Sequence, residues 1–368
     1  MPIKVLIVDD SALMRALLTE IINGAPDLEV VGAAPDPIAA REMIKTLNPN
    51  VLTLDVEMPR MNGLEFLDRL MRLRPMPVIM ISSFTAAGSE VTLKALELGA
   101  VDYLAKPRAE NISMLQGYAE DIRDKIRAAS GARLKSTSRV AVPPAPTLAL
   151  AKGSFSSRLL AEKVIAIGAS TGGTEAIKEV LSSLPGEMPP IVMVQHMPES
   201  FTPSFAQRLN SLSKLTVIEA QGGERLQPGM AYLAPGHSHM RVRKSGGGLV
   251  LELSQEEPVN RHRPAADVLF RSVAEYVGQN ALGVILTGMG KDGAQGLLAM
   301  RQAGAWNIGQ DQASCVVYGM PREAAEVGAL DEVATLADIA GSIVAKLRSL
   351  DRRGAQGRSI KSPVIAIR

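Results

Sequence analysis

A repeated alternation of short apolar runs with amphipathic stretches constrains this chain more than any other feature. In the first 125 residues the alternation occurs five times. The five runs are Lys4–Val8, Glu29–Ala33, Val51–Leu54, Val78–Ile81 and Val101–Leu104. Continuous β-branched runs separated by helix patterns are typical of strands buried on both faces of a parallel sheet. The pattern predicts a doubly wound α/β domain with a five-stranded parallel sheet.

A second α/β pattern begins at Val164 and continues to about residue 350. Its apolar runs are Val164–Ile167, Ile191–Val194, Leu215–Glu219, Met230–Ala234, Leu249–Leu253, Ala281–Leu286 and Ala305–Ile308. Several runs lead into a glycine-containing turn and then a helix pattern, which again favours parallel strands. Residues Met240–Leu253, interrupted by three glycines, predict a β-hairpin. We therefore expect a second doubly wound, mostly parallel α/β domain.

Changes in composition suggest where the domains end. No Asp or Glu occurs from Lys125 to Ala161, and Pro143, Pro144 and Pro146 lie close together in that segment. Such a composition favours an exposed, semi-rigid linker; a basic docking segment is the alternative. We predict a first domain at residues 1–125, a linker at 126–160, a second domain at 161–350 and a basic tail at 351–368.

Charge and cysteine content restrict the class of protein. The net charge of the 368 residues is only +2, so we expect no broad basic field, and nucleic acid is not favoured as a partner. Cys315 is the single cysteine, so no disulfide can form within the chain, which fits a reducing cytoplasm. It lies in an apolar run and is expected to be buried and unreactive. No signal peptide and no run of about 18 apolar residues is present. We expect a cytoplasmic protein without membrane insertion.

Three carboxylates follow strands of the first domain. Asp9 and Asp10 follow the first run and Asp55 follows the third. These strands are neighbours in the order 2-1-3-4-5, and ligands bind beyond the carboxyl ends of such strands. Three carboxylates close together repel one another unless a hard divalent cation is bound. Mg²⁺ fits such a site, because it binds carboxylate oxygens and leaves room for water and phosphate. Because Ser82 and Lys106 end the fourth and fifth units, the rim predicts a phosphoryl-binding site. Any one of these acids alone is better explained as a helix cap or a solvated side chain.

These residues resemble those of response-regulator receiver domains, which have a flavodoxin-like fold, over about residues 3–125. The resemblance is carried by Val8-Asp9-Asp10-Ser11, Asp55-Val56-Glu57-Met58-Pro59 with Gly63, and Lys106-Pro107. It implies that Asp55 is the phosphoacceptor. It implies that Asp9, Asp10 and the backbone carbonyl of Glu57 bind Mg²⁺. Ser82 would take the switch hydroxyl position, Lys106 would contact the phosphoryl group, and the face near Tyr103 would repack.

The first turn of the second domain presents a serine. The run Val164–Ile167 leads into Gly168-Ala169-Ser170-Thr171-Gly172-Gly173 and then a helix pattern. The G-x-S-x-G spacing places a serine on a tight turn close to backbone N–H groups, as nucleophilic catalysis requires. The same loop at a helix N-terminus also suits anion binding. Taken alone, the loop leaves catalysis, anion binding and a plain turn open.

A histidine and an aspartate follow two further strands. His196 comes directly after the run at 191–194, and Asp292 lies shortly after the run at 281–286. A Ser, a His and an Asp at neighbouring strand ends can form a relay in which Asp292 orients His196 and His196 deprotonates Ser170. The chain order Ser-His-Asp differs from the Ser-Asp-His order of α/β-hydrolases, so we expect a different fold.

Four other residues compete for these roles. His237 and His239 flank a probable turn and could bind a metal, but no second cluster with ligand spacing accompanies them. His262 lies in a polar loop that could line a substrate cleft. Asp267 opens an amphipathic helix and is better explained as an ordinary acid of the first turn.

The second domain resembles the chemotaxis protein-glutamate methylesterases, the CheB family. The resemblance is carried by Gly168–Gly173, Gln195-His196-Met197, Ala234-Pro235-Gly236, Asn260–Pro264 and Leu286–Gly290 with Asp292-Gly293. It implies Ser170 as nucleophile, His196 as general base, Asp292 as its orienter, and a backbone oxyanion site near Thr171 and Met289. Lys291 departs from the small polar residue expected there and could shift the pKa of His196 or Asp292.

The resemblance implies hydrolysis of glutamate methyl esters, and deamidation of glutamines, on chemoreceptors. The esterase step needs no cofactor, and the phosphodonor would be the chemotaxis histidine kinase, CheA. We expect the unphosphorylated receiver to cover the cleft that contains Ser170; recruitment of the enzyme by the receiver is the alternative. One other hypothesis is a non-enzymatic regulator that binds an anion at the serine loop. A second is a DNA-binding regulator, which is disfavoured because the sequence shows no helix-turn-helix pattern and no basic recognition helix.

Overall fold

The structure is a computed structural model, and it describes residues 1–368 except 59–60, 83–84, 107–111, 135–153 and 357–368. The first sheet is parallel with the order β2-β1-β3-β4-β5. Its strands are β1 (Ile3–Val8), β2 (Leu28–Ala34), β3 (Val51–Asp55), β4 (Val78–Ser82) and β5 (Asp102–Ala105). Its helices are α1 (Ala12–Asn23), α2 (Pro37–Leu47), α3 (Gly63–Leu73), α4 (Ala86–Glu97) and α5 (Ile112–Ser130). The predicted doubly wound, five-stranded domain is confirmed.

Strand β1 shows why its apolar run is continuous. Val5 and Ile7 are buried against one helix layer, and Leu6 and Val8 are buried in the layer on the opposite face. The first helices begin at side-chain caps: the Ser11 hydroxyl accepts a hydrogen bond from a backbone N–H of α1, and Asp36 does the same for α2. Because β1 pairs directly with β3, the residues that follow these strands meet at one rim.

The second domain contains a seven-stranded parallel sheet with the order β14-β13-β12-β6-β7-β9-β8. Its strands are β6 (Val164–Ala169), β7 (Ile191–Gln195), β8 (Thr216–Glu219), β9 (Met230–Leu233), β12 (Ala281–Ile285), β13 (Trp306–Gln310) and β14 (Glu332–Ala334). The predicted hairpin forms a separate antiparallel pair, β10 (His239–Ser245) and β11 (Gly248–Ser254). The short strand β14 was not predicted.

Helices and one short 3₁₀ turn surround this sheet. They are α6 (Ser157–Glu162), α7 (Gly173–Ser183), α8 (Thr202–Leu212), α9 (Ala266–Tyr276), η1 (Gly278–Asn280), α10 (Ala294–Gln302), α11 (Met320–Glu326) and α12 (Leu336–Gln356). Strand β6 lies between β7 and β12, with Ala169 opposite Gln195 and Gly168 opposite Ile285. The loops after these three central strands therefore start side by side at one end of the sheet.

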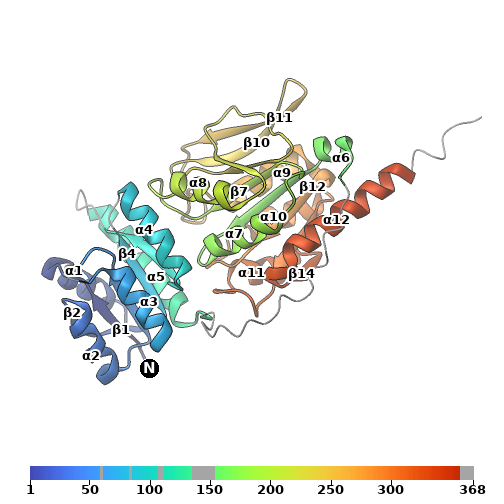
Figure 1. Ribbon diagram of the computed structural model, residues 1–368. Coiled ribbons are helices and arrows are strands. Elements are labelled where there is room, and N and C mark those ends of the chain that lie inside the picture. Colours follow the sequence, from blue (N-terminus) through green and yellow to red (C-terminus); the bar gives the residue numbers. More distant parts are fainter. Residues whose placement is uncertain (59–60, 83–84, 107–111, 135–153, 357–368) are drawn as a thin grey trace, which may run out of the picture.

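The first domain covers that end of the second sheet. Figure 1 shows the α4 and α5 side of the first domain facing the second domain, and α4 packs against α7 and α8. The ring of Tyr103, on β5, lies 4.6 Å from the ring of Phe201, and both side chains are buried. The Ser89 hydroxyl donates to the carbonyl of Ser200 at 2.7 Å. The Thr171 hydroxyl donates to the Asp102 carboxylate, so β5 reaches the serine loop itself.

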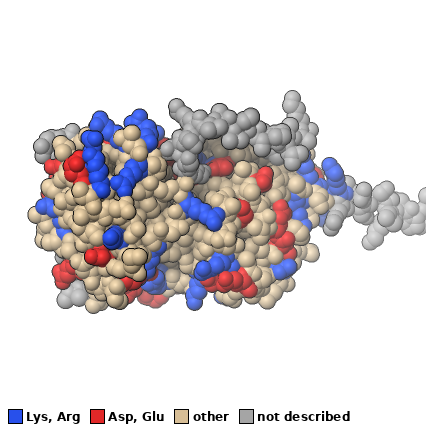
Figure 2. Space-filling model, turned by 90° about the horizontal axis from the view of Figure 1, so that it is seen from below, with Lys and Arg blue, Asp and Glu red and all other residues tan. Residues whose placement is uncertain are grey.

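Helix α5 continues to Ser130 and α12 to Gln356, and most of the expected linker and basic tail lie outside the described residues. No helix in the described part of the chain is both long and apolar enough to span a membrane. On the face shown in Figure 2, basic and acidic side chains are interspersed over both domains, with one group of basic side chains at the far left, on the first domain.

Candidate active site and acidic pocket

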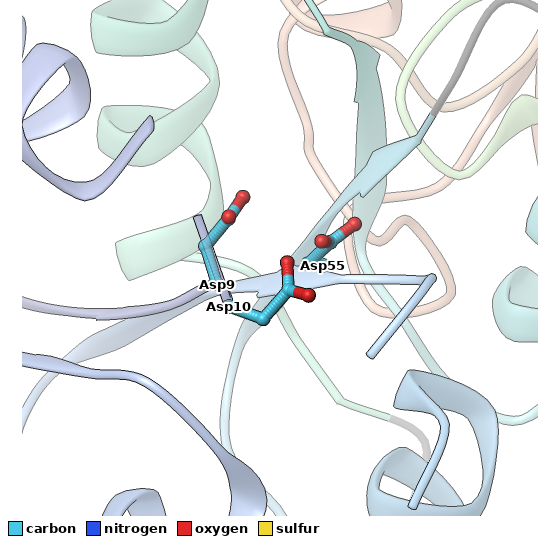
Figure 3. Close-up of side chains that lie close together, drawn as sticks. All are labelled: Asp9, Asp10 and Asp55. Atoms are coloured by element: carbon cyan, nitrogen blue, oxygen red, sulfur yellow. The ribbon is translucent and has the colours of Figure 1, made fainter. Parts of the chain in front are cut away.

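The three carboxylates predicted for the first domain lie together. Figure 3 shows the side chains of Asp9 and Asp10, at the end of β1, close to that of Asp55, at the end of β3, and one oxygen of each lies within 4.8 Å of the others. Asp9 and Asp55 are each 1% exposed, whereas Asp10 is exposed. The Oδ2 atom of Asp9 is buried and accepts no hydrogen bond from the described residues. Buried anionic oxygen without a donor fits a hard cation.

Lys106 closes this pocket. Its Nζ donates to Asp55 Oδ2 at 2.7 Å and lies 3.6 Å from Asp9 Oδ2. Burial raises the pKa of Asp55 to about 6, although the hydrogen bond from Lys106 lowers it, and burial also raises the pKa of Asp9. A buried carboxylate that is costly to keep charged is stabilised by a bound cation or by conversion to an acyl phosphate.

The remaining receiver residues lie around the same rim. Ser82 is fully buried at the end of β4, and its hydroxyl donates to the carbonyl of Gly88 in the first turn of α4 at 3.2 Å. The Tyr103 hydroxyl is buried without a hydrogen-bond partner among the described residues. The Glu57 backbone N–H donates to Asp55 Oδ1 at 3.2 Å. Metal ligation by the Glu57 carbonyl stays a prediction.

The serine loop is held by the neighbouring strand. After β6, the Ser170 backbone N–H donates to the carbonyl of Thr287 at 3.1 Å. Gly172 has φ +78°, a left-handed conformation that glycine adopts without strain and that lets the chain turn into α7. A Cβ on Gly288 would lie 2.8 Å from the Ser170 Cβ. Glycines at these two positions allow two loops to approach each other closely around the serine.

His196 and Asp292 form the predicted pair. His196 Nε2 lies 2.8 Å from Asp292 Oδ2, and the two side chains are 6% and 1% exposed. The opposite ring nitrogen, Nδ1, is buried and has no hydrogen-bond partner among the described residues. Since an ionised carboxylate can only accept, Nε2 carries the proton in neutral His196. Nδ1 is then the lone-pair nitrogen available to a nucleophile.

Asp292 is held by more than His196. Its oxygens accept hydrogen bonds from Asn260 Nδ2 at 2.8 Å and from the backbone N–H groups of Ala266, at 2.6 Å, and Asp267, at 3.1 Å. Burial alone would raise the pKa of Asp292, but the hydrogen bond and charge of His196, followed by the bonds from Asn260 and Ala266, lower it to about 2. Asp292 is therefore a fixed anion at neutral pH, and the exposed Lys291 is not needed to keep it charged.

Ser170, Thr171, His196 and Met289 share one cavity of about 230 Å³. From the second domain the cavity is also lined by Met197, Pro198 and the loop Arg261–Pro264. From the first domain it is lined by Tyr103, Leu104, Ala105, Asp121 and Lys125. The cavity therefore lies at the domain interface. The oxyanion role of the Thr171 and Met289 backbones stays a prediction.

The competing residues have structural partners. His239 is fully buried, with Nδ1 accepting from the Ala265 N–H at 3.2 Å and Nε2 3.1 Å from the Glu257 carbonyl. His237 Nδ1 lies 2.7 Å from the Ser238 hydroxyl. Neither belongs to a metal-binding cluster in the described residues. Cys315 is 2% exposed, and burial raises its pKa to about 12, in agreement with the prediction that it is unreactive.

Asp267 and its surroundings were only partly anticipated. It lies in the first turn of α9 as predicted, but it is buried, and its carboxylate accepts from the Gly296 N–H at 2.6 Å and from Asn260 at 3.0 Å. Asn260 thus joins two carboxylates, a role that its sequence motif did not reveal. His262 lines the cavity as expected, but its ring also stacks on His196 at 3.7 Å between centroids.

Comparisons with known proteins identify the family of each domain. The family model for the response regulator receiver domain matches residues 5–115, and the model for CheB methylesterase matches residues 165–343. A protein-glutamate methylesterase/protein-glutamine glutaminase of Nitrosomonas europaea is 61% identical over 345 residues, which cover 94% of this chain and 96% of that protein. A protein of the same name from Dechloromonas aromatica is 60% identical over 352 residues, with coverages of 94% and 99%.

A solved structure similar to the second domain is the CheB methylesterase catalytic domain of Thermotoga maritima. It is 40% identical, covers 50% of this chain and 97% of its own length, and gives a TM-score of 0.49. The two family models account for the two sheets in their order along the chain, and the full-length relatives extend over both domains. This chain therefore belongs to the CheB methylesterase family, here with a response-regulator receiver domain in front of the methylesterase domain.

Proposed function

We propose that this chain is a phosphorylation-activated serine hydrolase that removes methyl esters from glutamate side chains of chemoreceptors and deamidates receptor glutamines. One observation carries the proposal: His196, which is paired with Asp292, lines the same cavity as Ser170, and the three residues follow three neighbouring strands at their carboxyl ends. The names of the two full-length relatives supply the substrate class.

In the first half of the reaction, the Ser170 hydroxyl attacks the ester carbonyl and His196 Nδ1 accepts its proton. Asp292 holds the Nε2–H and stabilises the imidazolium that forms. The carbonyl oxygen, now negative, is received by the backbone N–H groups of Thr171 and Met289. Collapse of the intermediate expels methanol, which takes the proton from His196, and leaves the glutamyl group on Ser170 as an ester.

In the second half, a water molecule gives its proton to His196 and attacks the Ser170 ester. The bond to Ser170 breaks, the proton returns to the serine oxygen, and glutamate is released. A glutamine side chain enters the same sequence with ammonia in place of methanol. The Nδ1 atom of His196 is buried and has no hydrogen-bond partner among the described residues, and this supports the assignment because a general base needs a free lone pair.

The receiver controls access to this site. Five residues of β5 and α5 line the cavity that contains Ser170. The Thr171 hydroxyl, beside the proposed oxyanion site, is tied to Asp102 of the receiver. A receptor helix, about 10–12 Å across with its side chains, does not fit into a cavity of about 230 Å³. The unphosphorylated chain is therefore held at a low rate, and activation requires a change in this contact.

Phosphorylation of Asp55 supplies that change. Asp9, Asp10, Asp55 and the Glu57 carbonyl would hold Mg²⁺, and the bound ion would neutralise charge on the carboxylate and on the incoming phosphoryl group. Lys106 contacts the phosphoryl oxygens, since it already lies 2.7 Å from Asp55. The Ser82 hydroxyl exchanges its bond to Gly88 for one to the phosphoryl group, which shifts the start of α4. Helix α4 packs on the methylesterase domain, so this shift reaches the interface.

The phosphodonor we propose is the chemotaxis histidine kinase, CheA, and the chain acts in the cytoplasm on the signalling helices of methyl-accepting receptors. We also propose four segments along the chain: a receiver at residues 1–125, a linker at 126–160, a methylesterase domain at 161–350 and a basic tail at 351–368. The two family models, at 5–115 and 165–343, support this outline.

Replacing Ser170 with alanine tests the proposed nucleophile. We expect Ser170→Ala to release no methanol from methylated receptor, because the acyl acceptor is missing. The same variant should accept phosphate on Asp55 as the unmodified chain does, since that site lies in the other domain. Methanol release at a rate close to that of the unmodified chain would show that Ser170 is not the nucleophile.

A further inference from the structure

The loop between β11 and α9 contains a short segment that contacts both catalytic side chains of the His–Asp pair. We call Asn260, Arg261 and His262 the strap. Asn260 and Arg261 have φ +53° and +67°, which non-glycine residues rarely adopt. The turn is closed by Val259 and His262, whose backbones exchange hydrogen bonds at 2.9 and 3.0 Å. Two successive left-handed residues persist only where other contacts compensate for their strain.

Asn260 uses its amide group on two buried acids. Its Nδ2 donates at 2.8 Å to Asp292 Oδ1 and at 3.0 Å to Asp267 Oδ2. A primary amide nitrogen carries two hydrogens, so both bonds are made at once. The two carboxylates repel each other, and a shared donor between them offsets that repulsion. The Asp292 oxygen that Asn260 holds is the one that does not bind His196, so the bond fixes the orientation of the carboxylate.

His262 lies flat against the catalytic base. Its ring stacks on His196 with centroids 3.7 Å apart and an interplanar angle of 15°. Burial, followed by the nearby His196, lowers the pKa of His262, and Lys125 and Arg261 act in the same direction while Asp292 opposes them. The ring is therefore neutral across the physiological range, and it can cover one face of His196 whether or not His196 is protonated.

We propose that Asn260 and His262 are positioning residues of the esterase: Asn260 fixes the Asp292 carboxylate and His262 fixes the plane of the His196 ring. The proposal rests on the proposed function of Ser170, His196 and Asp292. A base with a free Nδ1 must point that atom at the serine, and rotation of an unsupported ring would misdirect it. The contacts made by Asn260 and His262, two positions apart in the strap, restrict that rotation.

Arg261, the middle residue of the strap, contacts the receiver. Its guanidinium forms ion pairs with Glu120 and Asp124 on α5 of the receiver. A strap variant could therefore change docking as well as positioning. Rates should be measured on the full chain with saturating acetyl phosphate as phosphodonor, so that receiver docking does not limit access in any variant.

The first comparison is Asn260→Ala with Asn280→Ala as the control. Asn280 accepts from Lys163 and precedes β12, at the opposite end of the sheet from Ser170. We expect Asn260→Ala to lower kcat for methanol release on the order of 10- to 100-fold, the scale of a displaced catalytic group, with KM within about twofold. Asn280→Ala should match the unmodified chain. A normal kcat in folded Asn260→Ala, or a raised KM with normal kcat, overturns the proposal.

The pH profile separates positioning from a purely structural role. Without the Asn260 donor, the negative charge of Asp292 acts more strongly on His196 and stabilises the imidazolium. The acid limb of kcat should then move to higher pH in Asn260→Ala and in the nearly isosteric Asn260→Asp. A lower midpoint of thermal unfolding with an unmoved acid limb would mean a structural role and overturn the proposal.

The His262 half is tested by His262→Phe and His262→Ala. Phenylalanine keeps a flat ring over His196 and should retain most of the kcat, whereas alanine should lose on the order of tenfold or more. Equal rates in the two variants overturn this half. Failure of the proposed function itself is distinguishable, because it appears as turnover in the unmodified chain that does not depend on Ser170.

Discussion

Replacing Glu97 with glutamine should activate the unphosphorylated chain. Glu97, at the end of α4, forms ion pairs with Lys178, at 3.4 Å, and with Arg208, both on the methylesterase domain. The three side chains are 19%, 25% and 27% exposed, so the pairs are only partly screened by water. Glutamine keeps the shape of the side chain and removes its charge. The variant therefore weakens docking without touching the phosphorylation site or the catalytic residues.

The size of the effect follows from these two contacts. Ion pairs of this exposure contribute about 0.2–1 kcal/mol each, so the pair of them contributes about 0.4–2 kcal/mol to docking. A free energy of about 1.4 kcal/mol corresponds to a factor of ten in an equilibrium constant. The open fraction, and with it the basal rate, should rise about 2- to 30-fold. The gain is smaller where docking is already weak, because the open fraction cannot exceed one.

The assay is methanol release from methylated receptor, with and without acetyl phosphate. Glu90→Gln is the matched control, because Glu90 lies on the same helix and is exposed. We expect the Glu97→Gln rate to exceed those of the unmodified chain and Glu90→Gln before phosphorylation and to equal them after it. Added salt should reduce the difference, since it screens the ion pairs in the unmodified chain. An unchanged or lower basal rate in Glu97→Gln would refute the docking model.

Two further predictions concern pH. The rate on phosphorylated chain should fall as pH drops from about 8 to about 5, a range that brackets ordinary histidine titration, because only neutral His196 accepts the serine proton; a flat profile would exclude a histidine base. Acidification over the same range should also lower the midpoint of thermal unfolding. Burial lowers the pKa of His239 in the folded state, so His239 takes up a proton when the chain unfolds, and lower pH favours the unfolded state. Between pH 7 and pH 5, the midpoint of thermal unfolding should fall less in His239→Gln than in the unmodified chain. An equal fall in both would show that His239 does not cause the pH dependence.

The sequence allowed most of the architecture to be predicted, because its signals are local. The β1 run is apolar on both faces, and Leu6 and Ile7 are buried in opposite layers. Ligands bind at strand ends in doubly wound sheets, so the locations of Ser170, His196 and Asp55 could be predicted from strand position. Their roles came from the family resemblance and stay proposals. Strand β14 was missed because Glu332–Ala334 is only three residues long and contains no continuous apolar run.

The features that were missed depend on tertiary contacts. The left-handed backbone of Asn260 and its double hydrogen bond arise only when the loop meets Asp267 and Asp292, which lie up to 32 positions away. The orientation of His196, with Nε2 on Asp292, cannot be read from residue type or spacing. The ion pairs of Glu97 and the bond from Thr171 to Asp102 depend on how two separately folded sheets meet.

The central claim is that one chain couples a phosphorylation site at Asp55 to ester hydrolysis at Ser170. The most direct test is the initial rate of methanol release from methylated receptor by the full-length chain with and without acetyl phosphate and Mg²⁺, beside Asp55→Asn. We predict that the phosphodonor raises the rate about 5- to 150-fold, the usual range of coupling between two sites, and that Asp55→Asn stays at the basal rate. Equal rates with and without phosphodonor, or full stimulation of Asp55→Asn, would contradict the account.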